Sequence, residues 1–122
     1  MNRILLIILL TLGSYGVQSQ SCDELMSYVK SESYGTTYNS YTSTAISKVT
    51  FYTTTIDYKT FYFAIVCFKS NEYSYNCSEY IYKVSSMTMT NYALNYLDGA
   101  GEAFWKYIQP YADNLDCSPN FD

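Results

Sequence analysis

The stretch FYFAIVCF at residues 61–68 constrains the fold more than any other part of the sequence. Apolar side chains occupy both alternating positions of an extended chain here, so a strand at this point needs cover on both of its faces. The neighbouring segments 45–55 and 78–86 are also rich in β-branched and aromatic residues. We expect three strands in an antiparallel meander, with the strand that contains this stretch in the centre.

Helical patterns flank the strand region on both sides. Ser21 stands three residues before Glu24, which is the spacing of a capping box at the start of a helix. Residues 88–109 show helical periodicity that breaks at 98–101, and Pro110 ends it. The sequence therefore predicts an α+β fold in which one short N-terminal helix and two short C-terminal helices accompany the three-stranded antiparallel meander.

Two local expectations complete the predicted fold. Residues 34–44 are polar, rich in serine and threonine, and without periodicity, so we expect a loop. Trp105 is the only tryptophan and follows the apolar pattern of the last helix. We expect its indole to be largely buried where that helix meets the sheet.

Four cysteines in a short chain predict a disulfide framework. Three pairings are possible, and the spacing favours Cys67 with Cys77 across a polar turn and Cys22 with Cys117 near the two ends. A metal site is disfavoured because the sequence has neither a CxxC motif nor a histidine. Both disulfides are expected to staple the domain.

The Cys67–Cys77 pair also suggests a register for the second and third strands. If these two cysteines lie opposite each other, Tyr62 faces Tyr82. Tyr80 then lies on the same face of the sheet, and the disulfide lies on the opposite face.

Residues 1–19 have the three-part layout of a secretory signal: a basic start, an aliphatic run at 4–12, and a small, polar end. The aliphatic run is about half of the roughly 20 apolar residues that a transmembrane helix needs. We therefore expect cleavage near Ser19 to Ser21 and no transmembrane span. Lipid attachment to Cys22 is a weaker alternative, because a serine stands where a leucine-like residue is usual.

Removal of this signal leaves residues 20–122, whose length suits a single domain. Together with the disulfides, the signal predicts a secreted or periplasmic protein.

The remaining chain has six lysines, 11 acidic residues, and neither arginine nor histidine. Histidine-assisted nucleophiles and the usual zinc sites are thereby excluded, and an acidic surface repels nucleic-acid phosphates. The glycines form no phosphate-binding loop. Asp98 and Glu102 are more typical of helix ends than of a two-carboxylate glycosidase. We expect no enzymatic activity, no catalytic or metal site, no cofactor and no nucleic-acid partner.

Tyrosine is abundant, with 16 residues in the chain. Two interpretations of the tyrosines near the predicted strands remain open. They form part of the core beneath the C-terminal helices, or they form an aromatic platform that binds a peptide, a sugar or a base. The candidate binding surface consists of Tyr62, Tyr73, Tyr75, Tyr80 and Tyr82.

The segments STAISKVTFY, FAIVCF, YIY and LDGAGEAFWKYI, taken in order, resemble the small KTSC domain, named for the lysyl-tRNA synthetase C-terminal domain. The family's central Tyr-x-Tyr is matched by Tyr80 and Tyr82, and its glycine turn with an aromatic pair by Gly101, Phe104 and Trp105. The resemblance covers about residues 43–109 of a single KTSC-like domain with N- and C-terminal extensions. It implies RNA binding, which has been suggested for the family. The export signal, the acidity, the four cysteines and the lack of arginine depart from that suggestion.

Two classes of function follow from these observations. The first is a non-catalytic interaction module with an unknown protein or glycan partner at the cell envelope. The second is a small secreted inhibitor or immunity-type protein that blocks an enzyme by inserting residues 70–78 or 34–44. RNA binding is the weaker third alternative.

Overall fold

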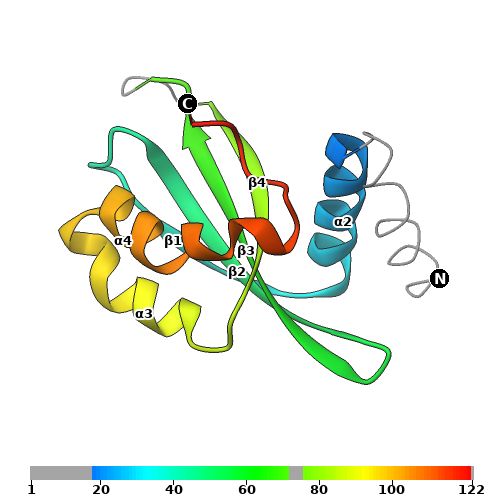
Figure 1. The fold of residues 1–122 in the computed structure, drawn as a ribbon. Coiled ribbons are helices and arrows are strands. Elements are labelled where there is room, and N and C mark those ends of the chain that lie inside the picture. Colours follow the sequence, from blue (N-terminus) through cyan, green and yellow to red (C-terminus); the bar gives the residue numbers. More distant parts are fainter. Residues whose placement is uncertain (1–17, 72–75, 122) are drawn as a thin grey trace.

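A four-stranded antiparallel sheet forms the centre of the computed structural model, which describes residues 18–71 and 76–121 (Figure 1). The strands follow one another along the chain and across the sheet, so the topology is a simple meander of four strands. They are β1 (Gly35–Asn39), β2 (Ile46–Ile56), β3 (Lys59–Lys69) and β4 (Cys77–Val84). The helices are α2 (Gln18–Glu32), α3 (Thr88–Asn95) and α4 (Ala100–Tyr107), with 3-10 turns η2 (Tyr96–Asp98) and η3 (Gln109–Asn114).

The expected α+β class is confirmed, but the three-stranded meander is wrong, because β1 adds a fourth strand at the edge. It lies within residues 34–44, which the sequence predicts to be a loop. Of its five residues only Tyr38 is partly buried. The Tyr38 ring packs edge-on against Phe51 and Tyr96, with centroids 5.9 and 5.3 Å away. Backbone pairing with β2 thus stabilises this strand. Because only one of its side chains faces the core, its sequence shows no alternation of apolar and polar residues from which a strand could be predicted.

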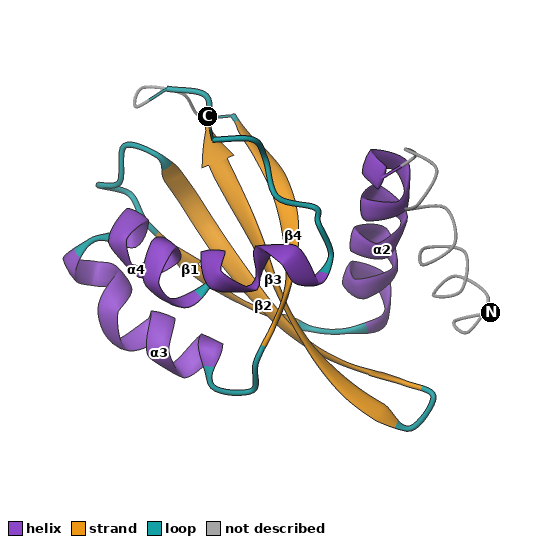
Figure 2. Cartoon of the chain, in the orientation of Figure 1, coloured by secondary structure: helices purple, strands orange, loops and turns teal. Residues whose placement is uncertain are grey.

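Helices cover both faces of the sheet, giving three layers (Figure 2). On one face, α3, α4 and η3 pack on Val49, Ala64 and Val66. On the other, α2 packs through Leu25 and Val29 on a second cluster that includes Phe63. The apolar residues on both faces of β3 are therefore covered, as the sequence pattern predicts, and every residue from Phe63 to Cys67 is buried.

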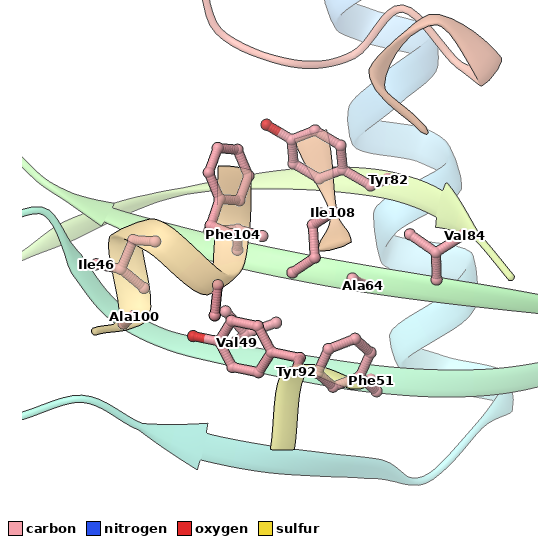
Figure 3. Close-up of a cluster of buried hydrophobic side chains, with 12 residues drawn as sticks. Ile46, Val49, Phe51, Ala64, Tyr82, Val84, Tyr92, Ala100, Phe104 and Ile108 are labelled. Carbon is pink, nitrogen blue, oxygen red and sulfur yellow. The ribbon is translucent and has the colours of Figure 1, made fainter. Parts of the chain in front are cut away.

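The larger core lies under the C-terminal helices (Figure 3). Phe104 of α4 is 1% exposed and meets the Tyr82 ring edge-on at 5.6 Å. Tyr92 of α3 is fully buried and stacks on Tyr96 at 5.5 Å. The Phe104–Tyr82 contact orients α4 on the sheet, and the contact of Tyr92 with Phe51 of β2, with centroids 5.6 Å apart, orients α3.

The two C-terminal helices lie where the periodicity places them, and the chain turns between them at Gly99. This residue has φ of 156° and ψ of 105°, a conformation that side-chain-bearing residues rarely adopt. It also leads into the first turn of α4. Glycine at this position is thus required by the backbone path between the two helices.

The start of the N-terminal helix differs from the sequence prediction. Helix α2 begins at Gln18, so Ser21 lies inside it rather than at its N-cap, and is 2% exposed. The capping-box interpretation is therefore wrong. The predicted signal peptide falls almost wholly on residues 1–17, which lie outside the described residues.

The predicted register of β3 and β4 is wrong by two residues. Cys67 lies opposite Glu79 and Cys77 opposite Lys69, so the disulfide joins a diagonal pair. Tyr82 accordingly faces Ala64 rather than Tyr62. A shift by two leaves every side chain on its predicted face, which is why the hydrophobic pattern fixes the faces but not the register.

Both disulfides have the pairing that the spacing favours. Cys22 joins Cys117 across 95 residues, and Cys67 joins Cys77 across 10. The larger loop ties α2 to the segment after η3. Such pairs are typical of oxidising compartments outside the cytoplasm.

The two disulfides should differ in their effect on stability. On the chain-entropy model, the Cys22–Cys117 bond stabilises by about 4 to 5 kcal/mol and the Cys67–Cys77 bond by about 3 kcal/mol. We expect the Cys22→Ser/Cys117→Ser double variant to be the less stable of the two double variants in urea unfolding followed by circular dichroism. The reverse order would mean that the long loop is already restrained in the unfolded chain.

The expected burial of Trp105 is also wrong. Its indole is 52% exposed, whereas its neighbour Phe104 points into the core. We expect Phe104→Ala to lower the free energy of unfolding by about 3 to 5 kcal/mol. Trp105→Ala, the matched control one residue away, should lower it by about 1 kcal/mol or less. Urea unfolding followed by circular dichroism measures both, and equal losses would contradict this orientation of α4.

Candidate functional site

The tyrosines predicted to form a binding platform lie mostly in the core. Tyr82 is 1% exposed, and Tyr62 and Tyr80 are partly buried against the same cluster. Tyr73 and Tyr75 lie outside the described residues. The inward-facing side of β3 and β4 is covered by α4 and η3, so the rings of the three described tyrosines serve mainly to pack those helices.

Two of the core tyrosines bury their hydroxyl groups as well as their rings. In the described part of the chain, neither Tyr82 Oη nor Tyr92 Oη has a hydrogen-bond partner in good geometry. Burial raises the pKa of both phenols above the ordinary value of 10. Imperfect hydrogen-bond contacts, of Tyr82 with Ser118 and of Tyr92 with Ser40, lower it by a smaller amount. For Tyr92 the pKa rises to about 12. Both groups stay neutral at physiological pH and offer no acid–base chemistry there.

The exposed tyrosines belong to turns and loops instead. Tyr34, Tyr41 and Tyr58 are 101%, 88% and 99% exposed. The sequence pattern does not point to these three as binding residues, because no alternating pattern surrounds them. What indicates their exposure in the sequence is their position between predicted elements, where an aromatic side chain does not reach the core.

The β2–β3 hairpin carries Tyr58 away from the body of the molecule (Figure 1). Its two-residue turn consists of Asp57 and Tyr58, with φ of 54° and 67°. Positive φ at both positions is typical of a type I′ turn, in which Asn-Gly is the favoured pair. A bulky tyrosine in this conformation costs about 1 kcal/mol. The turn is thus strained at the point that projects farthest, and strain of this kind concentrates at functional sites.

A hollow of about 530 Å³, here called the loop groove, lies between residues 39–45 and 96–102. The first wall is the connection between β1 and β2, and the second is the junction of η2 with α4. Hydroxyl side chains dominate the first wall, and Asp98 and Glu102 stand on the second. Its volume is in the usual range for small-ligand sites, about 300 to 1,000 Å³.

A smaller hollow of about 270 Å³ lies beside the Cys22–Cys117 disulfide. Asp23, Glu79 and Asp116 line it, and Lys30 forms an ion pair with Glu79. Within the described ranges, no group of three or more His, Cys, Asp or Glu side chains is placed to hold a metal ion.

Several lysines are engaged within the molecule. The Lys69 ammonium donates to the Ser43 carbonyl at 2.6 Å, and the Lys83 and Lys106 ammonium groups lie over aromatic rings at 5.1 and 5.5 Å. With the Lys30 ion pair, these contacts scatter the positive charge over different elements. These four lysines lie on α2, β3, β4 and α4, and each makes a contact within the molecule.

Comparison with known proteins finds no relative. No family model matches the chain. No curated protein is similar to it at a significant level. No solved structure matches it significantly. The KTSC resemblance therefore stays a prediction. Among the described helices, none combines the length and the apolar character needed to cross a membrane.

The buried phenol of Tyr92 predicts a pH dependence of stability. Its pKa is about 12 in the folded protein and 10 in the unfolded chain. The free energy of unfolding is therefore highest below pH 10 and falls as the pH rises from 10 to 12. Tyr92→Phe keeps the ring and removes an unpaired hydroxyl, so it should change stability at pH 7 by less than about 1 kcal/mol. The stability lost between about pH 7 and pH 11 should shrink by roughly 1 kcal/mol.

Urea unfolding at the two pH values measures this difference. Tyr41→Phe is the control, because Tyr41 is exposed and should leave the alkaline loss unchanged. An equal alkaline loss in Tyr92→Phe and wild type would contradict the burial of the Tyr92 hydroxyl.

Proposed function

We propose that this protein is an exported, non-catalytic interaction module that contacts a partner protein through exposed tyrosines, foremost Tyr58. The observation that carries the proposal is the β2–β3 hairpin, which extends beyond the helices and ends in a fully exposed tyrosine (Figure 2). An aromatic ring at such a tip can enter a pocket of a partner and bury a large apolar area with little loss of side-chain entropy. The strained turn supports the same proposal, since a glycine there would be more stable.

The chemistry of the described residues agrees with a role in binding. The four cysteines are paired, and the two buried phenols are neutral at physiological pH. The disulfides also support export, because they persist where the environment is oxidising. Residues 1–19 remain the proposed signal.

An inhibitor or immunity-type role is the second candidate, and the hairpin favours it too. A rigid, projecting loop held by a long two-stranded ladder can enter the cleft of an enzyme without ordering on binding. Of the two segments expected from the sequence to insert, 34–44 contains the edge strand at 35–39, and 70–78 includes residues 72–75, which lie outside the described residues, so its role stays a prediction. RNA binding is a weaker candidate because the positive charge is scattered and the chain is acidic.

Tyr58→Gly separates a functional role of the hairpin from a structural one. The substitution relieves the strained turn, so we expect the protein to be as stable as wild type or more stable, by up to about 1 kcal/mol. Immobilised wild type and Tyr58→Gly are each exposed to envelope and secreted proteins of the source organism. A partner should be captured in stoichiometric amount by wild type and at least tenfold less by the variant.

Tyr34→Ser is the matched control, because Tyr34 is equally exposed but lies before β1. It should capture the partner as wild type does. If the captured partner is an enzyme whose activity falls on binding, the inhibitor role is supported over a plain interaction module. Equal capture by wild type and Tyr58→Gly, or no stoichiometric partner at all, would overturn the role of the hairpin.

A further inference from the structure

The loop groove is built on a wall that the fold holds in one conformation. The Ser43 hydroxyl accepts a hydrogen bond from the Ile46 amide at 3.0 Å, and the Ser43 carbonyl accepts one from the Lys69 ammonium at 2.6 Å. The Ser40 amide donates to the Ser47 carbonyl at 2.9 Å. A ligand entering the groove therefore meets a preorganised surface and causes little loss of loop entropy.

The groups on this surface are those that recognise a sugar ring. Tyr41 lies at the groove with its ring 88% exposed, so one aromatic face is free for the C–H face of a pyranose. Thr42 and Thr44 supply hydroxyl groups that both donate and accept. On the other wall, the exposed carboxylates of Asp98 and Glu102 can each accept hydrogen bonds from two neighbouring sugar hydroxyls. We propose that the loop groove binds a neutral carbohydrate chain.

A buried hydroxyl on the groove wall that lacks a well-formed hydrogen bond agrees with this inference. Ser40 lines the groove and is 8% exposed, and its Oγ has no hydrogen-bond partner in good geometry among the described residues. The nearest hydroxyl is Tyr92 Oη, whose contact with Ser40 lowers the Tyr92 pKa as a hydrogen bond does but is not in good geometry. A buried polar group without a partner is unfavourable, and a sugar hydroxyl that reaches the groove wall would supply one.

The charge of the groove decides between ligand classes. Two carboxylates face it and the ammonium of Lys69 is directed to a backbone carbonyl, so an anionic ligand is repelled. A basic peptide would match the carboxylates by charge, and it is the competing ligand in the test below. A neutral polyhydroxyl ligand satisfies both walls together.

The structure also provides a way to block the groove without disturbing the fold. Gly101 lines it at the start of α4, and a Cβ added there meets no atom within 4 Å. Gly101→Gln should therefore fold normally and fill part of the groove. Thr90→Gln, on an exposed position of α3 outside the groove, is the matched control.

The test begins with the full disulfide-bonded protein on an array of neutral oligosaccharides, including β-linked glucose, N-acetylglucosamine, mannose and galactose chains. Titration calorimetry with the best-bound soluble oligosaccharide then compares the variants. We expect Tyr41→Ala and Asp98→Asn to weaken binding at least tenfold, and Gly101→Gln to abolish it. Thr90→Gln and the hairpin variant Tyr58→Gly should bind as wild type does, which makes this result independent of the proposed protein partner.

Ionic strength separates the two ligand classes. Carbohydrate affinity should change less than twofold between low and high salt, because the ligand is uncharged. The proposal is overturned if no oligosaccharide on the array binds, or if Gly101→Gln and Tyr41→Ala bind like wild type. It is also overturned if a lysine-rich peptide binds the groove more tightly than every sugar, with an affinity that falls steeply with salt.

Discussion

The burial of β3 on both faces is the constraint on which the rest of the structure depends. Phe63 and Ile65 pack towards α2, while Ala64 and Val66 pack towards the C-terminal helices. Neither face can be left open to water, because each carries several large apolar side chains. Both faces therefore need to be covered by helices. The helix on one face precedes the strands in the chain, and the helices on the other face follow them (Figure 1).

The C-terminal segment completes this arrangement by passing the free edge of β4. Tyr111 and Ala112 still pack on the larger core, whereas Leu115 and Cys117 belong to the cluster under α2. On the way, the Asn114 side-chain amide donates to the Lys83 carbonyl at 2.9 Å. The Cys22–Cys117 bond then fixes the crossing. An edge strand covered in this way is protected from pairing with other chains.

The use of Tyr82 and Tyr92 in the core explains why the two surfaces proposed for binding lie on connecting segments. Tyr82 and Tyr92 are buried in the core, where their rings help to orient the helices on the sheet. The side chains left for partners sit on the short connections, at the hairpin tip and around the loop groove. Both places combine exposure with a backbone that is hydrogen-bonded within the fold, which lowers the entropic penalty of binding.

The sequence by itself determined the fold class, the faces of β3 and β4, the pairing of the cysteines and the break between α3 and α4. Each depends on local composition, on a period of two, or on the spacing of a few residues. The tertiary structure alone decided the existence of β1, the register between β3 and β4, the outward turn of Trp105 and the place of the candidate site. Backbone pairing stabilises β1 without any apolar pattern, and a shift by two residues preserves every face. Phe104 and Trp105 are adjacent and both aromatic, so only the packing of α4 on Phe68 and Tyr82 selects the one that enters the core. The two walls of the loop groove are more than fifty residues apart in the sequence, so they come together only when the C-terminal helices pack on the sheet.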